Sequence, residues 1–199
     1  ERQVQKRTKE LELANKDLIK QQNEIYNLAY FDSTTSLPNR LYFVEELDNI
    51  FENIEKRENR FGILFLDLDK FKHINDTLGH NVGDHILKLF GMRLNKLVEG
   101  NGIVAKGGGD EYYILLDNLK EDYDAMEIAH KIIEDFNKPY YIKDLELYLT
   151  TSIGIALYPD SGLDPHTILK NADLALYKAK DKGGNSYYFY GEEIESKGF

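Results

Sequence analysis

The first 28 residues are polar except for apolar side chains that lie seven residues apart. The apolar residues in this series are Val4, Leu11, Leu18 and Ile25. Seven-residue spacing is typical of a helix that packs its d positions against a partner helix. The positions four residues further on are mostly polar and include Asn15 and Gln22, so we expect a weak coiled coil. The alternative is a solvated linker helix without a partner.

Beyond residue 28, apolar runs alternate with segments of helical periodicity. A continuous apolar run at 61–69 predicts a buried central strand, and glycines between two apolar runs at 102–118 predict a hairpin. The pattern also predicts a long strand at 145–160 and a short one at 185–190. Helices are expected at 39–59, from about residue 83 to 98 after a loop, at 122–140 and at 164–184. This order lacks the regular repeat of a doubly wound sheet, which favours an α/β sandwich of roughly five strands with helices on its faces.

Composition narrows the class of function. The chain has 199 residues and a formal net charge of −10, which argues against nonspecific binding to nucleic acid or anionic lipid. Without cysteine it can form neither disulfides nor cysteine zinc sites, as suits the cytoplasm. No apolar run approaches the roughly 20 residues that span a membrane, and no signal peptide opens the chain. Because it begins at Glu1, we expect a piece of a longer protein that could carry a membrane anchor upstream.

Four acidic residues lie where the central strand and the hairpin end. Asp67 and Asp69 close the run at 61–69, while Asp110 and Glu111 follow three glycines at the hairpin turn. If the hairpin pairs beside the central strand, three or four carboxylates meet, and such crowding calls for a cation. Oxygen ligands with room for phosphates suit Mg²⁺, and glycines let backbone N–H groups approach a phosphate closely. Taken singly, each motif could be a solvated strand end or a tight turn, but together they favour two-metal nucleotidyl transfer.

Five blocks of sequence, in order, resemble the GGDEF domain of the diguanylate cyclase family. The signature is GGDEY at 108–112, and the block at 67–87 matches the family's D-x-D-x-F-K-x-x-N-D-x-x-G-H-x-x-G-D pattern. The other blocks are YFDSTTSLPNR at 30–40, TTSIGIALYP at 150–159 and ADLALYKAKDKGGN at 172–185. The resemblance covers about residues 28–191 and implies a palm-like α+β fold related to nucleotidyl cyclases. We therefore expect a signalling coiled-coil helix at 1–28, a GGDEF domain at 29–192 and a tail at 193–199.

The resemblance also implies a reaction. The family makes cyclic di-GMP from two GTP molecules, one held by each of two facing domains, with Mg²⁺ or alternatively Mn²⁺. By position, Asp67 and Asp110 would bind Mg²⁺ together with the backbone carbonyl of Leu68. Asp110 would also help to remove the proton of the attacking 3′-hydroxyl, and Glu111 would bind a second metal or orient the first.

The substrate-binding positions follow from the same resemblance. Lys72 and Lys180 would neutralise the triphosphate of GTP. Asp84 suits guanine, because a carboxylate accepts from the N1–H and N2–H donors, whereas adenine presents an acceptor at N1. The remaining positions are Phe71, Gly108 and Gly109 near the phosphates, and Asn75 and His80 near guanine and ribose.

Several of these residues also have a purely structural interpretation, and others depart from the family. Asp84 could cap a helix, Asn75 and His80 could belong to turns, and Lys180 could be an exposed helix lysine. Glu99 and Gly102 replace the Arg and Asp of the family's product-inhibition motif, so we expect that feedback site to be missing. The other departures are Thr34, Ser36, Lys106, Gly107, Tyr112 and Gly184, of which Lys106 and Gly184 stand where arginine is usual.

Three functions therefore remain open. The first is an active diguanylate cyclase that works as a homodimer under an upstream sensor. The second is a GTP-binding module that regulates an attached domain, such as an EAL phosphodiesterase. The blocks at residues 29–40 and 185–194 resemble those of GGDEF domains that precede a phosphodiesterase domain. The third is a dimerisation unit, which would have no need for the combination of Asp67, Asn75, Asp84 and Asp110. The expected partners are GTP, cyclic di-GMP and a second copy of the chain, and no nucleic acid.

Overall fold

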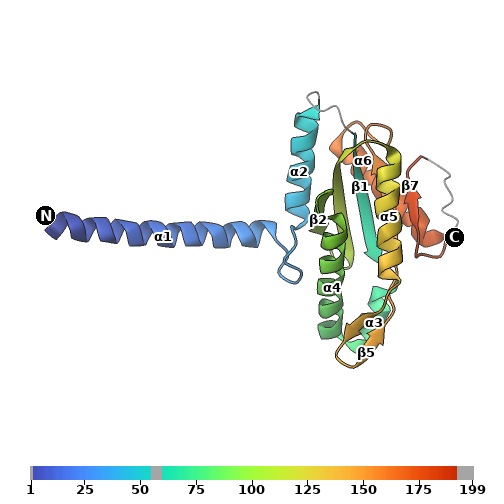
Figure 1. Ribbon diagram of the computed structural model, residues 1–199, viewed down its shortest axis with the longest axis horizontal. Coiled ribbons are helices and arrows are strands. Elements are labelled where there is room, and N and C mark those ends of the chain that lie inside the picture. The colour runs from blue at the N-terminus through green and yellow to red at the C-terminus, as the bar shows by residue number, and fades with distance from the viewer. Residues whose placement is uncertain (1, 55–59, 192–199) are drawn as a thin grey trace.

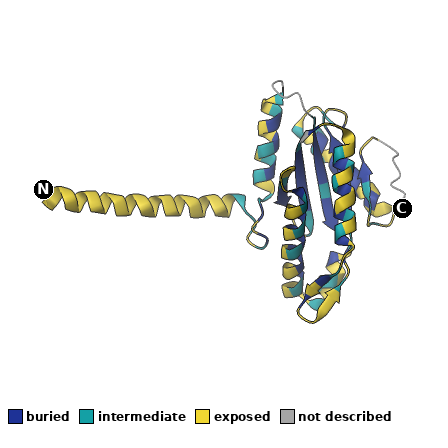
Figure 2. Ribbon diagram, in the orientation of Figure 1, coloured by how far each residue is buried: buried dark blue, intermediate teal, exposed yellow. Residues whose placement is uncertain are grey.

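A long helix projects from a mixed α+β domain (Figure 1). This computed structural model describes residues 2–54 and 60–191, so residues 55–59 of the expected second helix and the expected tail at 193–199 lie outside it. The projecting helix, α1 (Arg2–Tyr30), buries none of its residues, and its apolar stripe is exposed along its length (Figure 2). The expected N-terminal helix is confirmed. Among the described helices, none combines the length and the apolar character that crossing a membrane requires.

The domain is built on a five-stranded sheet, as the apolar runs predict. Its strands are β1 (Arg60–Leu68), β2 (Gly102–Lys106), β3 (Glu111–Leu119), β6 (Thr151–Leu157) and β7 (Tyr187–Phe189). Their order across the sheet is β2-β3-β1-β6-β7, and only the pair β6 and β7 is parallel. The central place of β1 explains why its residues 61–66 are apolar in an unbroken run rather than alternating, since both faces of the strand are covered.

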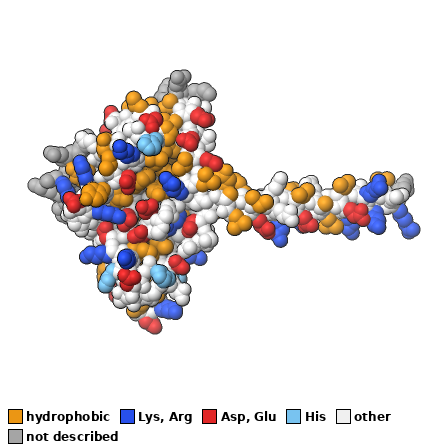
Figure 3. All heavy atoms as spheres, turned by 180° about the vertical axis from the view of Figure 1, so that it is seen from behind, with side chains coloured by type: hydrophobic (Ala, Val, Ile, Leu, Met, Phe, Trp, Pro, Cys, Tyr) orange, Lys and Arg blue, Asp and Glu red, His pale blue; other side chains and the backbone are white. Residues whose placement is uncertain are grey.

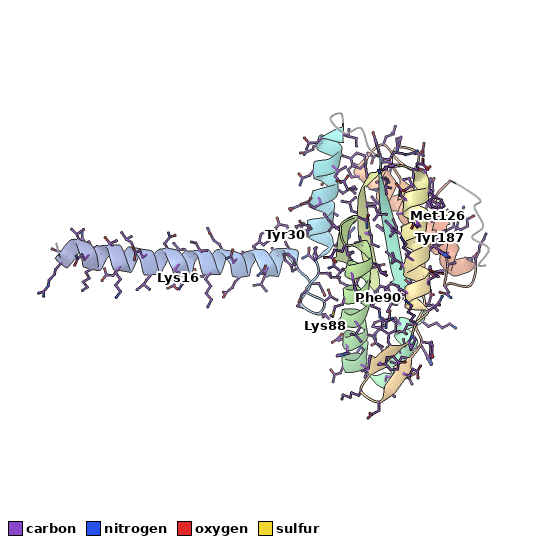
Figure 4. The ribbon with its side chains drawn as sticks, viewed as in Figure 1. Lys16, Tyr30, Lys88, Phe90, Met126 and Tyr187 are labelled. Carbon is purple, nitrogen blue, oxygen red and sulfur yellow. The ribbon has the colours of Figure 1, made fainter. Side chains whose placement is uncertain are left out.

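Helices cover both faces of the sheet and enclose two separate cores. On one face, α4 (His80–Val98) and α5 (Asp122–Phe136) pack against side chains such as Leu64 and Tyr112. On the other face, α2 (Arg40–Glu52) and α6 (Pro165–Asp181) pack against side chains such as Ile63 and Tyr113. The view with side chains shows Phe90 of α4 turned to the sheet and Lys88 turned away from it (Figure 4). Successive strand residues thus serve opposite faces, which places each site residue on one known side.

Three expected boundaries are wrong in instructive ways. The helix expected from about Gly83 begins at His80, and a further helix, α3 (Phe71–Leu78), occupies the segment before it. The helix expected at 122–140 ends at Phe136, because Pro139 disfavours helical backbone just before it. The strand expected at 145–160 is two strands: β5 (Leu145–Leu147) pairs with β4 (Tyr140–Ile142) in a separate hairpin, and β6 begins at Thr151. A left-handed Lys143 makes the turn of that hairpin.

The segment between α1 and α2 contacts the end of β2 and so joins the projecting helix to the β2–β3 hairpin. Asn39 donates from Nδ2 to the carbonyl of Ala29 at the end of α1 (2.7 Å) and accepts at Oδ1 from Tyr42 N–H at the start of α2 (3.1 Å). The backbone N–H of Lys106 donates to the carbonyl of Pro38 (2.7 Å). Tyr30, at the end of α1, lies close to α2 (Figure 4) and donates to Glu45 (3.1 Å). Short polar contacts therefore link α1 to the end of β2, where the signature turn begins.

Candidate functional site

The acidic residues of the two sequence motifs meet at one end of the sheet, as predicted from the pairing of the hairpin with β1. Asp67 of β1 lies directly opposite Glu111 of β3 in the antiparallel register. Directly opposed residues point to the same face, which here is the face covered by α2 and α6. Asp67 is 9% exposed, and Asp110 and Glu111 are partly exposed beside it. Two chain segments more than forty positions apart in the sequence thus bring three carboxyl groups to one edge.

A lysine from a third segment completes this edge. Lys180, in the last turn of α6, places Nζ 2.8 Å from Oδ2 of Asp67. Burial raises the pKa of Asp67 above its ordinary value, the Asp110 and Glu111 charges raise it further, and Lys180 opposes both effects. The described residues contain no group of three Asp, Glu or His side chains already arranged as metal ligands. The crowded acids nevertheless fit a hard cation that takes its remaining ligands from backbone carbonyl and phosphate oxygens.

Asp69, the other acid that closes β1, does not join this group. Its carboxylate accepts from the hydroxyls of Thr150 (2.6 Å) and Ser152 (2.6 Å) and from the backbone N–H of Asn185 (2.9 Å). Of the three or four carboxylates expected to meet, three do, and Asp69 instead holds the turn after α6 against β6. The same turn explains Gly184, where a Cβ would lie 3.0 Å from the Asp69 carboxylate and φ is +76°. An arginine at this position would not fit the turn as it stands.

The signature turn is held from inside by Lys106. Its Nζ donates to the carbonyls of Gly109 (2.6 Å), Gly107 (3.1 Å) and Glu111 (3.3 Å), and the residue is only 4% exposed. Burial lowers the pKa of Lys106, and the surrounding acids, Asp32 first, oppose that shift. Although Lys106 and Gly107 both depart from the family, three charge-assisted hydrogen bonds hold the turn. Sequence reasoning noted the lysine only as a replacement and missed this role.

Around that lysine the turn leaves its glycine backbone accessible. Gly108 and Gly109 are both exposed. Gly109 takes φ +56°, and no atom lies within 4 Å of where its Cβ would be. The backbone of residues 108 and 109 is therefore exposed beside the acids and not shielded by side chains. This geometry suits a turn whose backbone N–H groups approach a phosphate closely.

The segment before α2 shows how the chain accommodates its departures from the family there. Asp32 accepts at Oδ1 from the backbone N–H and the hydroxyl of Thr35 (both 2.7 Å). Ser36 stands where the family has glycine and takes φ +60°, a left-handed conformation that costs a serine more than a glycine. Thr34 is partly exposed, and nothing in its surroundings explains its replacement of leucine.

The residues expected to read guanine lie on two successive helices that meet at Gly79. Asn75 is on α3, where its Oδ1 is buried without a hydrogen-bond partner in the described structure. Asp84 is within α4 and exposed, so the alternative of a helix cap is wrong, because α4 begins at His80 with Gly79 as its cap. The turn interpretation of Asn75 is wrong as well. An orphaned buried acceptor on α3 and an exposed carboxylate on α4 together suit a ligand that offers several N–H donors.

The remaining predicted positions lie around the start of α3. Phe71 is the first residue of this helix and is buried, Lys72 is exposed beside it, and Lys70 before it is left-handed. Leu68 ends β1 next to Asp67 and is 1% exposed. His80 opens α4 and is exposed. The structure thus brings Asp67, Asp110, Glu111 and Lys180 together, and it places the guanine candidates on the adjoining helices.

A residue that the motifs did not single out lies at the same edge. Tyr113 donates from its hydroxyl to Oε2 of Glu111 (3.0 Å). Burial, with the Glu111 charge next, raises the pKa of Tyr113 to about 12, while Arg40 opposes the shift. The phenol therefore keeps its proton at neutral pH and acts as a donor. The side chains of Arg40, Phe65, Glu111 and Tyr113 line a cavity of about 600 Å³ on the face covered by α2 and α6.

Comparison with known proteins places this site in a family. A family model described as "Diguanylate cyclase, GGDEF domain" matches residues 29–186. The signaling protein YkoW of Bacillus subtilis is 40% identical over 186 residues, which are 92% of this chain and 23% of YkoW. The bifunctional diguanylate cyclase/cyclic di-GMP phosphodiesterase MucR of Pseudomonas aeruginosa is 38% identical over 173 residues, which are 87% of this chain and 25% of MucR. The chain spans about a quarter of the length of these relatives.

The fold agrees with that assignment. The crystal structure of the coiled coil and GGDEF domain of DgcB from Caulobacter crescentus, in complex with c-di-GMP, matches with a TM-score of 0.85. The match covers 94% of this chain and 98% of that one at 23% sequence identity, so it shows a common fold, including a long N-terminal helix before the sheet domain. With the acids, the glycine turn and this palm-like sheet in their expected places, the family match shows that the chain belongs to the GGDEF domain family of diguanylate cyclases.

Proposed function

We propose that this domain binds GTP and that two copies of it condense two GTP molecules into cyclic di-GMP and two pyrophosphates. In this reaction each 3′-oxygen loses its proton and bonds to the α-phosphorus of the other GTP. Two bonds between α- and β-phosphates break in exchange. The observation that carries the proposal is that Asp67, Glu111 and Lys180, which come from three separate segments, lie together at one end of the sheet, where β1 ends and β3 begins. Such an edge combines carboxylates for a metal with a cation for phosphate.

Magnesium, or manganese as the alternative, fits the acids at this edge. Asp67 and Asp110 would hold the ion with the carbonyl of Leu68, and Glu111 would hold a second ion or orient the first. When bound, the metal supplies positive charge to the triphosphate and lowers the pKa of a bound hydroxyl. Asp110, partly exposed at the turn, is the group assigned to help remove the proton of the attacking 3′-hydroxyl.

GTP would lie between α3, the signature turn and the end of α6. Asn75 and Asp84 would accept from the N–H groups of guanine, with His80 toward the sugar. The orphaned Oδ1 of Asn75 supports this assignment, because a buried acceptor without a partner gains most from a ligand donor. The residues assigned to the triphosphate are Lys72, Phe71, Gly108, Gly109 and Lys180.

Catalysis would require two domains, because the reaction uses two GTP molecules. The residues assigned within one domain form one guanine site and one group of metal-binding acids, enough for one GTP. The exposed heptad residues of α1 are suited to bring a second copy close. We infer that this helix forms a two-stranded coiled coil and transmits a signal from an upstream sensor. Such pairing raises the effective concentration of one domain near its twin.

An assay with a forced dimer tests the proposal. The chain is fused at its N-terminus to a strongly dimerising coiled coil, and this fusion protein is incubated with GTP and Mg²⁺. The products are identified by mass spectrometry. Cyclic di-GMP is expected from the fusion, and none is expected from Asp110→Asn, which should melt like the wild type. Turnover by Asp110→Asn at the wild-type rate would remove Asp110 from the mechanism.

A second candidate is a GTP-binding module with little turnover that regulates an attached domain, such as an EAL phosphodiesterase. Gly184 favours it, because this position lacks the arginine that the family often uses on phosphate, and a Cβ there would lie 3.0 Å from the Asp69 carboxylate. The name of MucR, which includes both activities, is consistent with such a setting. GTP binding by the forced dimer without cyclic di-GMP formation would select this candidate.

A further inference from the structure

Gly107 and Tyr113 lie against each other beside the signature turn. A Cβ added to Gly107 would lie 2.8 Å from both Cζ and Oη of Tyr113 and 2.9 Å from Cβ of Glu111. These distances are shorter than ordinary side-chain contacts, so even alanine would displace the phenol or the turn. Glycine suits position 107 because Tyr113 and Cβ of Glu111 occupy the space that a side chain would take.

Packing fixes the ring of Tyr113 in place. The residue is 7% exposed, and its ring centroid lies 4.5 Å from that of Phe65 and 5.3 Å from that of Phe43. Phe65 is also its direct partner across the β1–β3 pair, just as Asp67 is the partner of Glu111. Contacts with two aromatic rings therefore restrict where the hydroxyl lies, and the hydroxyl donates to Glu111.

The carboxylate of Glu111 needs such a fixed donor. It is partly exposed, borders the cavity of about 600 Å³ and lies opposite the buried carboxyl of Asp67. Like charges repel, and the cavity leaves the side chain room to rotate away from Asp67. A neutral hydroxyl at 3.0 Å opposes that movement without neutralising the charge.

Figure 3 shows the side of the molecule opposite to Figure 1, where acidic, basic and apolar side chains are interspersed across the domain.

We propose that Tyr113 is a positioning residue that holds the Glu111 carboxylate beside Asp67, and that Gly107 provides the space for its ring. The effect on catalysis rests on the proposed cyclase function, whereas the contact itself does not. The tests below therefore use one readout of stability and one of turnover.

The stability test measures coupling between the two side chains by thermal and urea unfolding. Tyr113→Phe should lower the midpoint in the wild type and lower it much less in Glu111→Ala, because the hydroxyl then has lost its acceptor. Tyr112→Phe is the matched control: its hydroxyl donates to the carbonyl of Leu87 (2.6 Å) on the other face, so its effect should add to that of Glu111→Ala. Equal effects of Tyr113→Phe in both backgrounds would overturn the contact.

The space test uses the two neighbouring glycines. Gly107→Ala should destabilise the wild type more than the Tyr113→Val variant, in which only the contact with Cβ of Glu111 at 2.9 Å remains. Gly108→Ala should have a small effect in both, because the nearest non-neighbouring atom to its Cβ is Oε2 of Glu111 at 4.0 Å. A Gly107→Ala effect that is independent of residue 113 would contradict the proposed role of Gly107.

The catalytic test compares Tyr113→Phe and Tyr112→Phe in the forced dimer. Tyr113→Phe should lower kcat by about tenfold, as for a lost hydrogen bond to a charged group, and raise the Mg²⁺ concentration for half-maximal rate. KM for GTP should stay close to the wild-type value, because the guanine residues are untouched, and Tyr112→Phe should change neither constant. Unchanged kcat and Mg²⁺ dependence in Tyr113→Phe would refute the positioning role. If the wild type makes no cyclic di-GMP, the proposed function fails, and the stability test still decides whether Tyr113 holds Glu111.

Discussion

Nζ of Lys180 lies 2.8 Å from Oδ2 of Asp67, so the last turn of α6 is tied to the end of β1. The pair joins two segments that are far apart in the sequence, and β3 adds Asp110 and Glu111 from a third. Burial and the neighbouring acids raise the pKa of Asp67, and the Lys180 cation opposes this effect by favouring the charged carboxylate. The same acids would accept a metal together with GTP.

Guanine selectivity should depend on Asp84. Replacing it by alanine leaves two guanine N–H groups without their acceptor, a cost of about 1–3 kcal/mol, or roughly 5- to 150-fold in affinity. Calorimetric titration of Asp84→Ala with GTP and with ATP should show that the preference for GTP is reduced or lost. His85→Ala, which changes an exposed side chain on the same turn of α4, is the control and should keep the preference. An unaltered preference in Asp84→Ala would remove this residue from guanine recognition.

Lys106 should matter for both stability and turnover. Lys106→Met removes the donor to three carbonyls of the signature turn, and the loss should cost about 1–3 kcal/mol in the free energy of unfolding. Turnover in the forced dimer should fall as well, since the turn carries Asp110 and Glu111. Lys106→Arg keeps charge and donors and should retain most of both properties. If the Lys106→Met variant is as stable and active as the wild type, the hydrogen bonds of Lys106 are not needed to hold the signature turn.

The start of α6 should contribute to acid stability. Asp164 accepts from the hydroxyl (2.6 Å) and the backbone N–H (2.9 Å) of Thr167, and these bonds hold its pKa below its ordinary value. A carboxyl with a lowered folded pKa stabilises the fold above its unfolded pKa of about 3.9, and this contribution is lost as the pH falls through the folded pKa.

Asp164→Asn tests this, because asparagine can still cap the helix but does not titrate. Melting temperatures measured between roughly pH 2 and 6 should fall less steeply for Asp164→Asn than for the wild type at the acid end. Asp173→Asn, at an exposed position within the same helix, should follow the wild type. Parallel curves for Asp164→Asn and the wild type would contradict the assignment.

Product inhibition at the family's usual site should be weak or absent. Glu99, just after α4, and Gly102, the first residue of β2, are both exposed. Glu99 would repel a dinucleotide phosphate, and Gly102 offers no side-chain acceptor. Calorimetry with cyclic di-GMP should show no tight binding there. Sub-micromolar binding that Glu99→Ala alters would show that another geometry serves the same purpose.

The sequence predicted the sheet and its acidic edge because these depend on local patterns. The apolar run at 61–69 and the glycine turn at 107–109 each identify an element, and antiparallel pairing then places Asp67 opposite Glu111. The helix α3 escaped prediction because it has only eight residues and contains Asn, Asp and Thr, which are weak helix formers. Its position depends on packing with α4 rather than on its own periodicity.

The side-chain partners at the site could not be predicted in the same way. Asp69 bonds to Thr150, Ser152 and Asn185, and nothing in the repeat pattern of β1 distinguishes it from Asp67. Lys106 is charged and yet buried, against its usual preference, because turn carbonyls surround it. Such roles depend on residues that are distant in the sequence, so the local sequence pattern around Asp69 or Lys106 does not predict them.

The central claim is that two domains, each with one GTP, must meet for the reaction to occur. Initial rates of cyclic di-GMP formation by the unfused chain, measured across about a hundredfold range of protein concentration with sedimentation at each point, test it most directly. The account predicts a rate per chain that rises with concentration in step with the dimer fraction. Replacing Asn15 and Gln22 by Ile should strengthen the α1 pair and shift this rise to lower concentration, provided that the new register suits the catalytic pose. A constant rate per chain in a protein that sediments as a monomer throughout would contradict the claim.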